Sequence, residues 1–458
     1  MNQKKAAPGV QKRPRFETPP PPPPGLAARQ AAAAAFADVV ANGRSLDERF
    51  AADSHFSLDV RDRALARSIV VASLRRLGTI RAALARFLER GLPKKAGPLE
   101  YILTTSAAQI LFLDVPDHAA VDLAVHAARA DQRSAPFASL VNAVLRNIAR
   151  EKDSILAGED PSLADPFLDM PLWLAARWRK SYGEDVAARM ALMMRHEPTL
   201  DLSVRSDAEQ WAEKIGGIVL PTGSVRLVNR AGIDELPGYA DGQWWVQDAA
   251  AALPARLLNV KPGERVADLC AAPGGKSAQL AAAGAEVIAL DKSAERLRRL
   301  AVNFERLKLP VDIAVGDALT YEAQPFDAVL LDAPCSATGT IRRHPDVAWV
   351  KRASDIAALA LVQAKMLERA CGMLKPGGRL VYCTCSLEAE EGPAQIAALL
   401  RRNPDMVRAP ISADEVGGLD ECLTSEGDVR TMPIHLPADD PRLAGLDGFF
   451  IARLERKK

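Results

Sequence analysis

Two thiols stand one residue apart in the segment LVYCTCSLEAEE, at the end of an apolar run. Side chains alternate along a strand, so Cys383 and Cys385 would point to the same side if the strand continued. A disulfide between them would be short and strained, and no second CxC or CxxC pair with histidines offers a zinc site. We therefore favour free thiols over a disulfide or a metal site. For Cys383 we expect the role of a small buried hydrophobe.

A glycine-containing loop occurs in DLCAAPGGKSAQLA, at residues 268–281. The pattern predicts a strand, a loop and a helix that begins near Lys276, so that loop amides and the helix N-terminus point toward a ligand. Gly274 and Gly275 let a ligand approach the backbone because they carry no Cβ. The spacing matches neither GxGxxG nor the P-loop pattern. Lys276 either reaches the ligand or Asp332, or simply begins its helix.

Acidic residues close three successive apolar runs. Asp291 ends EVIALD, Asp317 ends DIAVGD and Asp332 ends FDAVLLD. Ligands of open α/β sheets bind outside the carboxyl ends of the strands, so the three acids and the glycine loop should line one crevice. Asp291 could bind the hydroxyls of a ribose, and Asp317 could face an adenine amino group. Each acid alone is more readily explained as a helix cap or turn residue, but the ordered set favours a nucleoside cofactor.

The elements that carry these residues belong to a domain that we place at residues 256–458. Short apolar runs alternate there with helical stretches, which predicts an α/β fold with an open, largely parallel, Rossmann-like sheet. Residues 28–152 have apolar positions at helical spacing and predict an all-α domain. The mixed pattern of residues 165–255 predicts a small α+β connector. Residues 1–27 contain five basic residues and six consecutive prolines, which is typical of a disordered tail.

The net charge of +1 hides an uneven distribution along the chain. Residues 1–150 contain 22 Lys and Arg but only 13 Asp and Glu. Such an excess suits a nucleic acid partner, although a basic tail with solvated helix faces explains it equally well. Five arginines crowd one helical segment as either a solvated face or an RNA-facing stripe: Arg75, Arg76, Arg81, Arg86 and Arg90.

Membrane and secretory features are not recognisable in the sequence. No apolar run approaches the ~18 residues of a membrane span, and the first residues lack the apolar core of a signal peptide. Six cysteines in so long a chain fit reduced thiols. We therefore expect a cytoplasmic protein that does not associate with membranes.

Four motifs occur in a characteristic order: CAAPGGK at 270–276, GD at 316–317, DAPCS at 332–336 and TCS at 384–386. Together they resemble the NOL/NOP/Sun family of RNA cytosine-5 methyltransferases. The helical front, with RDRALARSIV, PDHAAVDLAV and SLVNAVLRNI, resembles the RNA-binding NusB-like domain of the Sun/Fmu branch, and the closing GFFIARL also matches. The resemblance implies S-adenosylmethionine as cofactor and small-subunit (16S) ribosomal RNA as substrate, methylated through a covalent cysteine–cytosine intermediate.

The resemblance also implies a role for each motif residue. The methionine part of the cofactor would be held by Cys270, Ala271, Ala272, Pro273, Gly274, Gly275 and Lys276. Asp291 would bind the ribose, Asp317 the adenine, and Asp332 would lie between cofactor and target base. Cys385 would be the nucleophile and Cys335 would help to release the product. We expect no metal and a monomeric protein.

One segment departs from the family pattern. Residues 202–205 read LSVR, where relatives tend to have Arg-x-Asn, which weakens any expectation of RNA contacts there.

Arg342, Arg343 and His344 follow the DAPCS motif and either touch RNA phosphate or form a solvated loop. We expect Trp349 and the pair Trp244 and Trp245 in a core or interface, and Gln247 and Asp248 as caps of the next helix.

Two other function classes remain open from the sequence. In a non-catalytic RNA-binding assembly factor the cofactor domain would be vestigial, but such a protein has no need of the thiols in DAPCS and TCS. A methyltransferase for small molecules has no use for the helical front. A DNA methyltransferase resembles a scheme with a single proline–cysteine motif, whereas this chain has two strand-end cysteines.

Overall fold

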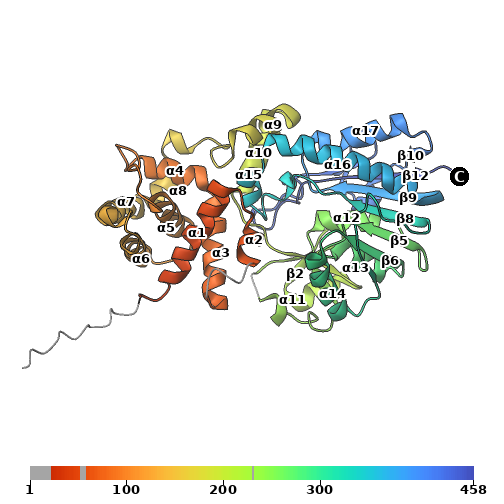
Figure 1. Cartoon of the computed structure of the whole chain (residues 1–458), viewed down its shortest axis with the longest axis horizontal. Coiled ribbons are helices and arrows are strands. Elements are labelled where there is room, and N and C mark those ends of the chain that lie inside the picture. The colour runs from red at the N-terminus through yellow and green to blue at the C-terminus, as the bar shows by residue number, and fades with distance from the viewer. Residues whose placement is uncertain (1–21, 52–57, 230–231) are drawn as a thin grey trace, which may run out of the picture.

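The computed structural model describes residues 22–51, 58–229 and 232–458 of the chain (Figure 1). Its first part is all helical. The helices are α1 (Leu26–Asn42), α2 (Leu46–Ala51), α3 (Val60–Arg75), α4 (Leu77–Ala85), α5 (Leu99–Phe112), α6 (Asp117–Ala130), α7 (Ala138–Arg150) and α8 (Lys152–Ala157). Helix α1 thus begins two residues inside the range expected for the tail. Residues 1–21 of that range lie outside the described residues.

Helix α5 is the centre of the helical part because nearly all of its side chains are buried. Small residues such as Ala107 and Ala108 allow neighbouring helices to approach it closely. Helix α7 shows the amphipathic pattern from which the domain was expected. Its residues Val141, Val144 and Ile148 recur at helical spacing and are all buried.

The connector contains a pair of helices followed by a small sheet. The elements are α9 (Leu172–Tyr182), α10 (Glu184–Met194), β1 (Asp201–Val204), α11 (Ala208–Ile215), β2 (Gly217–Val219), β3 (Val225–Leu227) and β4 (Trp244–Val246). The strands form an antiparallel sheet in the order β2-β3-β1-β4. Trp244 and Trp245 are buried in β4, as expected for core residues.

The last part is a sheet with helices on both faces (Figure 1). Its strands are β5 (Arg265–Leu269), β6 (Glu286–Asp291), β7 (Asp312–Val315), β8 (Phe326–Asp332), β9 (Leu374–Thr384), β10 (Met406–Arg408), β11 (Val429–Thr431) and β12 (Phe449–Arg456). Its helices are α12 (Ala249–Leu257), α13 (Gly275–Ala282), α14 (Ala294–Leu307), α15 (Asp346–Val350), α16 (Ala353–Gly372) and α17 (Pro393–Arg402).

The sheet order is β10-β12-β9-β8-β5-β6-β7, and β11 pairs with β12. Strands β5 to β9 are parallel, and β12 runs antiparallel to β9. Residues of α12, α13 and α14 contribute to the apolar core on one face, and residues of α16 and α17 to the core on the other. The parallel register brings the carboxyl ends of β5, β6, β7, β8 and β9 to one edge, as the Rossmann-like expectation required.

The helical part docks on the rest of the molecule through the end of α3. Arg75 donates hydrogen bonds to the backbone carbonyls of Met194 (3.1 Å), His196 (3.2 Å) and Arg342 (2.6 Å). The indole of Trp349 donates to the carbonyl of Leu74 at 2.9 Å, which makes Trp349 an interface residue.

The five arginines expected to share one helical segment have different environments in the structure. Arg75 is buried at the interface, and Arg76 lies 3.2 Å from Asp169. Arg81 pairs with Glu100 and Arg86 with Glu151, within the helical part. Arg75 and Arg76 therefore leave the expected stripe, whereas Arg81, Arg86 and Arg90 are exposed, as either alternative predicted. Across residues 22–51, 58–229 and 232–458, no helix has the length and apolarity needed to cross a bilayer.

Candidate active site

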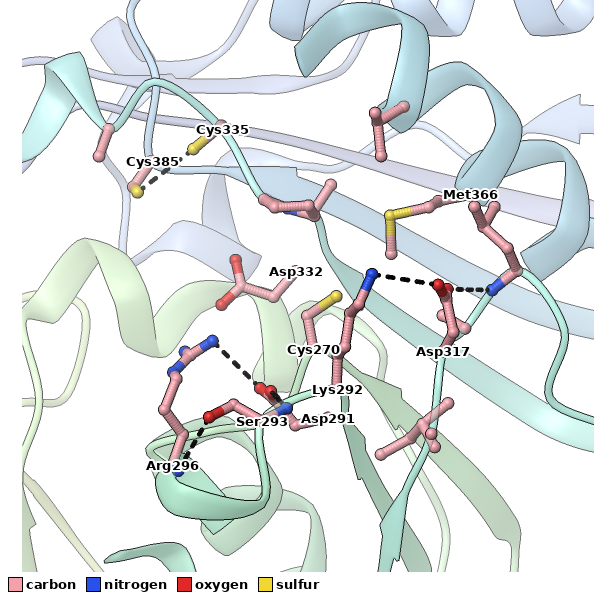
Figure 2. Close-up of a pocket in the computed structure, with 18 residues that line it drawn as sticks. Cys270, Asp291, Lys292, Ser293, Arg296, Asp317, Asp332, Cys335, Met366 and Cys385 are labelled. Atoms are coloured by element: carbon pink, nitrogen blue, oxygen red, sulfur yellow. Dashed lines mark hydrogen bonds and ion pairs between the residues drawn. The ribbon is translucent and has the colours of Figure 1, made fainter. Parts of the chain in front are cut away.

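A cavity of ≈ 650 Å³ opens at the carboxyl edge of the parallel sheet. Figure 2 shows side chains from successive strand ends around it, as the order of acids in the sequence predicts. Its lining includes Cys270 after β5, Asp291 at the end of β6, Asp317 after β7, Asp332 at the end of β8 and Cys385 after β9. Cys335, Ser293, Leu290, Val362 and Met366 also line it.

The loop between β5 and α13 forms part of the site. Gly274 has φ = +104°, a left-handed conformation that favours glycine, and a Cβ there would lie 2.8 Å from Leu300. Cys270 adopts φ = +65° and lines the cavity. Burial raises the pKa of its thiol to about 12, so Cys270 keeps its proton. The structure therefore places it as a lining residue and not as a nucleophile.

Asp291 is anchored at the bottom of this cavity. Its Oδ1 accepts a hydrogen bond from the Ser293 amide at 2.9 Å, and its Oδ2 accepts one from the Ala272 amide at 3.2 Å. The guanidinium of Arg296 lies 3.2 Å from Oδ2 (Figure 2). Arg296 is more than half exposed, so its side chain can move when a ligand enters.

Asp317 lies at the other end of the cavity and is more open to solvent. Its Oδ1 accepts a hydrogen bond from the Leu319 amide at 3.0 Å, and this bond lowers the pKa of the carboxyl. The only other partner of its carboxylate among the described residues is Lys292, whose highly exposed ammonium lies 3.4 Å from Oδ2. Asp317 is therefore ionised at neutral pH and free to accept a hydrogen bond from an amino group.

Cys335 and Cys385 meet at the inner end of the cavity, with their sulfurs 3.5 Å apart (Figure 2). They come from the loops after β8 and β9. The hydrogen bond with Cys385, together with burial, raises the pKa of the Cys335 thiol. Cys335 therefore holds its proton more firmly than an ordinary thiol, and the two sulfurs share a hydrogen bond. The expectation that Cys383 and Cys385 point to the same side required the strand to continue through both residues. Strand β9 ends at Thr384, so Cys385 lies just beyond it.

Asp332 carries two hydrogen bonds that fix its carboxylate. The ammonium of Lys276 donates to Oδ2 at 2.7 Å, and the buried thiol of Cys383 donates to Oδ1 at 3.4 Å. Burial alone would lower the pKa of the Lys276 ammonium, but the nearby Asp332 carboxylate outweighs it and raises that pKa. Lys276 is therefore a cation of the site, and Cys383 both packs in the core and supports Asp332.

A second cavity of ≈ 490 Å³ lies between the connector sheet and the Rossmann-like domain. Asp332 and Cys385 line both cavities, so the carboxylate and the sulfur stand where the two spaces meet. Lys276, Phe449 and His344 also line the second one. The ammonium of Lys276 lies 5.4 Å from the centre of the Phe449 ring.

The structure corrects the expectation for the segment after DAPCS. Arg342 is buried and donates to Asp447 at 2.8 Å, so it cannot touch RNA phosphate. Arg343 binds Asp248 at 2.6 Å and lies 3.3 Å from Asp201. Buried carboxylates hold both arginines because a buried guanidinium needs partners of opposite charge. His344 is exposed and lines the second cavity, as the RNA-facing alternative requires.

The cap of α12 comes from one of the two expected residues. Asp248 accepts hydrogen bonds from the amides of Ala250 and Ala251. Gln247 does not cap the helix through a backbone amide. Its side chain accepts from the Trp245 indole at 2.7 Å and donates to Gln279 at 2.8 Å.

Sequence reasoning missed two residues of the site. Phe449, within GFFIARL, lines the second cavity, but the sequence of a strand gives no local sign that one of its residues borders a cavity. Glu391 lies in LEAEE and is fully buried, with hydrogen bonds to the serines that follow Cys335 and Cys385. The repeated Cys-Ser pair is the one signal that could have pointed to a shared partner.

Comparison with known proteins assigns the chain to a family. A model described as 16S rRNA methyltransferase RsmB/F matches residues 255–455, and the NusB family model matches residues 26–150. The ribosomal RNA small subunit methyltransferase B of Xanthomonas campestris pv. campestris is 40% identical over 396 residues, which cover 82% of this chain and 88% of the relative. The chain belongs to the RsmB/F family of 16S rRNA methyltransferases. Its NusB-like front and its methyltransferase domain were both correctly predicted.

Other relatives and structures agree with the RsmB/F assignment. The ribosomal RNA small subunit methyltransferase B of Cronobacter sakazakii is 35% identical and aligns with 92% of this chain and 97% of its own. The crystal structure of PH0851 superposes with a TM-score of 0.69 at 24% identity, over 96% of this chain and all of the other, which shows the shared fold. A methyltransferase homologue from Pyrococcus horikoshii is 29% identical, with a TM-score of 0.53 and coverage of 65% and 99%.

Proposed function

We propose that this protein is an S-adenosylmethionine-dependent RNA cytosine-5 methyltransferase that acts on small-subunit (16S) ribosomal RNA. The observation that carries the proposal is the position of Asp332 and Cys385, which line both cavities at their junction. A cofactor in the first cavity and a nucleotide in the second would meet at these two side chains. The names of the RsmB/F relatives supply the class of RNA.

The first cavity fits S-adenosylmethionine by the chemistry of its lining. Asp291 offers carboxylate oxygens to ribose hydroxyls, and Asp317 offers an acceptor to the adenine amino group. Leu290, Val362 and Met366 supply apolar surface for a purine ring. Cys270 lines the first cavity, and Pro273, Gly274, Gly275 and Lys276 line the second. The loop from Cys270 to Lys276 would therefore hold the methionine part where the two cavities meet. The acids that sequence analysis assigned to the cofactor are thus kept as proposed ligands.

The target base explains why a thiol is required. Carbon-5 of cytosine is a poor nucleophile, and addition of a thiolate to carbon-6 makes it electron-rich, so covalent catalysis splits one difficult step into easier ones. When bound, S-adenosylmethionine supplies an electrophilic methyl group on a sulfonium centre. Cys385 is the residue placed to add to carbon-6, since its sulfur reaches the junction of the two cavities.

Cys335 is proposed to handle the end of the reaction. A proton must leave carbon-5 before the sulfur of Cys385 can depart and restore the aromatic ring. Cys335 lies 3.5 Å from Cys385 and holds its own proton in the resting protein. After its own proton passes to solvent, the Cys335 sulfur can accept the proton that leaves carbon-5, while the Cys385 sulfur departs as a thiolate.

Asp332 is proposed to orient the base. Both of its oxygens accept hydrogen bonds from the protein, one from Lys276 and one from Cys383. This arrangement favours acceptance of a further hydrogen bond from the exocyclic amine of cytosine over donation to ring N3. The Lys276 ammonium lies beside the site and stabilises negative charge that develops on the ring during addition.

The helical part is proposed to dock ribosomal RNA. Residues 1–150 carry the basic excess of the chain, and the NusB family model covers residues 26–150. A base that reaches the second cavity must leave its stack, as in other enzymes that modify nucleobases. A cytoplasmic location and a monomeric state form part of the same proposal.

The proposal is tested with Cys385→Ala in cells that lack the wild-type protein. We expect the wild-type protein to restore a methylated cytosine in 16S ribosomal RNA, as read by bisulfite sequencing, and Cys385→Ala to restore none. Calorimetry should show unchanged binding of S-adenosylmethionine by the variant. Cys371→Ala, in the buried face of α16, is the matched control and should stay active. Methylation by Cys385→Ala would exclude this residue as the nucleophile.

A further inference from the structure

Glu391 is a buried carboxylate that connects the two cysteine loops. It ends the short 3-10 turn Ala389–Glu391 after β9, and its side chain is fully inaccessible to solvent. Its Oε1 accepts hydrogen bonds from the Ser336 amide at 2.9 Å and from Gln363 at 3.0 Å. Its Oε2 accepts from the hydroxyls of Ser336 and Ser386, the latter at 2.5 Å.

The two serines make this carboxylate relevant to catalysis. Ser336 follows Cys335 and Ser386 follows Cys385, and their hydroxyl oxygens lie 3.2 Å apart. The neighbouring sulfurs are separated by a similar distance, 3.5 Å. Each thiol is therefore one residue from a hydroxyl that binds the same oxygen of Glu391. The two cysteine loops are thus linked through a carboxylate that accepts no hydrogen bond from either thiol.

Glu391 is itself held firmly in place. Its backbone carbonyl accepts hydrogen bonds from the Tyr382 hydroxyl at 2.8 Å and from Thr384 at 3.1 Å, both on β9. Gln363 reaches it from α16 and also donates to the carbonyl of Pro334, in the DAPCS loop. A buried network whose members are all satisfied is rigid, and loss of one acceptor leaves several donors unpaired.

We propose that Glu391 is a positioning residue that sets the approach of Cys335 to Cys385 by binding the serine after each cysteine. The inference rests on the proposed function, because it assigns Glu391 to the breakdown of the covalent intermediate. Without this carboxylate the two loops separate, and Cys335 no longer reaches the sulfur or the ring at the moment of release. A displacement of about 1 Å in such a site costs about 10²-fold in rate.

Glu388 provides a matched control in the same turn region. It is also buried, but its carboxylate binds Arg177 at 2.5 Å and Trp178 at 3.3 Å, both on α9. Its side chain therefore holds the connector and not the cysteine loops. Glu388→Ala should destabilise the fold as Glu391→Ala does, and any effect common to both variants reports only loss of a buried carboxylate.

The test compares purified full-length wild-type protein, Glu391→Ala and Glu388→Ala on 16S ribosomal RNA. For Glu391→Ala we expect kcat to fall about tenfold or more, with KM for RNA and the Kd of S-adenosylmethionine within about threefold of wild type. Denaturing gels should show accumulation of a covalent protein–RNA adduct, as expected for Cys335→Ala. The double variant of Glu391→Ala with Cys335→Ala should release its adduct no more slowly than Cys335→Ala alone. Glu388→Ala should show a lower melting temperature without an adduct.

Two conservative variants keep the inference testable if Glu391→Ala does not fold. Glu391→Gln retains one oxygen for the Ser336 amide and Gln363, while its amino group can donate to the two hydroxyls, so turnover should recover substantially. The pair Ser336→Ala with Ser386→Ala removes the links and should accumulate adduct. The inference is overturned if the serine double variant or Glu391→Ala lacks the adduct, as Glu388→Ala does, or if Glu391→Gln accumulates the adduct. A wild-type protein that does not methylate cytosine would instead refute the proposed function.

Discussion

At the scale of single residues, the pKa values of most of the cysteine thiols are raised, so these thiols keep their protons. Burial raises the pKa of Cys270, Cys371 and Cys422 each to about 12, and that of Cys383 also rises. None of these thiols can readily supply a thiolate. Cys335 keeps its proton because of its hydrogen bond with Cys385 and its burial. The proposed division of labour, with Cys385 as nucleophile and Cys335 as its proton-bearing partner, follows from these environments.

Replacement of the second thiol tests this division. Cys335→Ala removes the group that assists elimination but leaves the sulfur of Cys385 in place. We expect a stable covalent adduct between protein and RNA, visible as a shifted band on denaturing gels after incubation with S-adenosylmethionine. The band should be lost when Cys385→Ala is added. A variant that turns over without an adduct would show that Cys335 has no part in release.

Asp268 provides a test of pH dependence beneath the same site. It is fully buried at the end of β5, where the Ser277 hydroxyl donates to it at 2.5 Å. Burial, with a smaller contribution from Asp332, raises its pKa from 3.8 to about 7. Between pH 4 and pH 7 the folded state therefore keeps a proton that the unfolded state has lost, and this group lowers stability as the pH rises.

Comparison of wild type with Asp268→Asn isolates this contribution. The variant cannot ionise at this position, so its free energy of unfolding should rise relative to that of wild type between about pH 4 and pH 7, by up to about 1.4 kcal/mol per pH unit. Above pH 7 the difference should stay constant. Denaturant titrations at several pH values measure it. Parallel pH profiles for the two proteins would show that Asp268 does not titrate in this range.

At the scale of elements, the loop that follows Cys335 both lines the site and packs against the C-terminal strand. The segment between Cys335 and α15 includes the 3-10 turn Thr338–Thr340, which lies against the start of β12. The amide of Gly448 donates to the carbonyl of Gly339 at 2.8 Å. Gly339 also donates its own amide to the carbonyl of Cys385 at 3.0 Å. The turn thus connects Cys385 to the C-terminal strand.

Gly339→Ala tests this contact between backbones. A Cβ at this position would lie 1.8 Å from the carbonyl oxygen of Gly448, so the turn must shift. We expect a loss of about 1–3 kcal/mol in stability and a lower kcat with unchanged cofactor affinity. Gly372→Ala is the control, since its Cβ would meet nothing within 4 Å. If both variants retain full activity and stability, the close packing of this turn does not matter.

At the scale of the whole molecule, the helical part is joined to the catalytic part close to the site. Arg75 binds the carbonyl of Arg342, seven residues beyond Cys335, as well as two carbonyls of the connector. The amide of Leu46 donates to Asp346 at 3.0 Å, and Trp349 reaches Leu74. RNA held by the helical part would therefore have a defined position relative to the thiols.

Arg75→Ala should weaken this docking. The variant leaves buried carbonyls without their charged donor, and we expect a loss of about 2–4 kcal/mol, measured as a lower melting temperature. Faster proteolysis between residues 158 and 171 should accompany it. Arg90→Ala, at an exposed position of the same arginine-rich segment, should change stability by no more than about 0.5 kcal/mol. Equal melting temperatures for the two variants would contradict a stabilising role for Arg75.

The sequence by itself determined the fold class and the order of the three acids that line the first cavity. Apolar runs that end in Asp291, Asp317 and Asp332 predict parallel strands, and such strands bring their carboxyl ends to one edge whatever the details of packing. The helical front followed from residues at helical spacing such as Val141, Val144 and Ile148. These features depend on short-range rules of side-chain periodicity, which a single sequence displays.

Only the tertiary structure decided which distant residues meet. It paired Cys335 with Cys385, placed Glu391 against the serines after both, and turned Arg342 inward to Asp447 instead of toward solvent. Such contacts join residues separated by 50 or more positions in the chain or depend on how a loop folds back, so no local pattern encodes them. They arise because buried polar groups must find partners, and the packing of the whole molecule selects those partners.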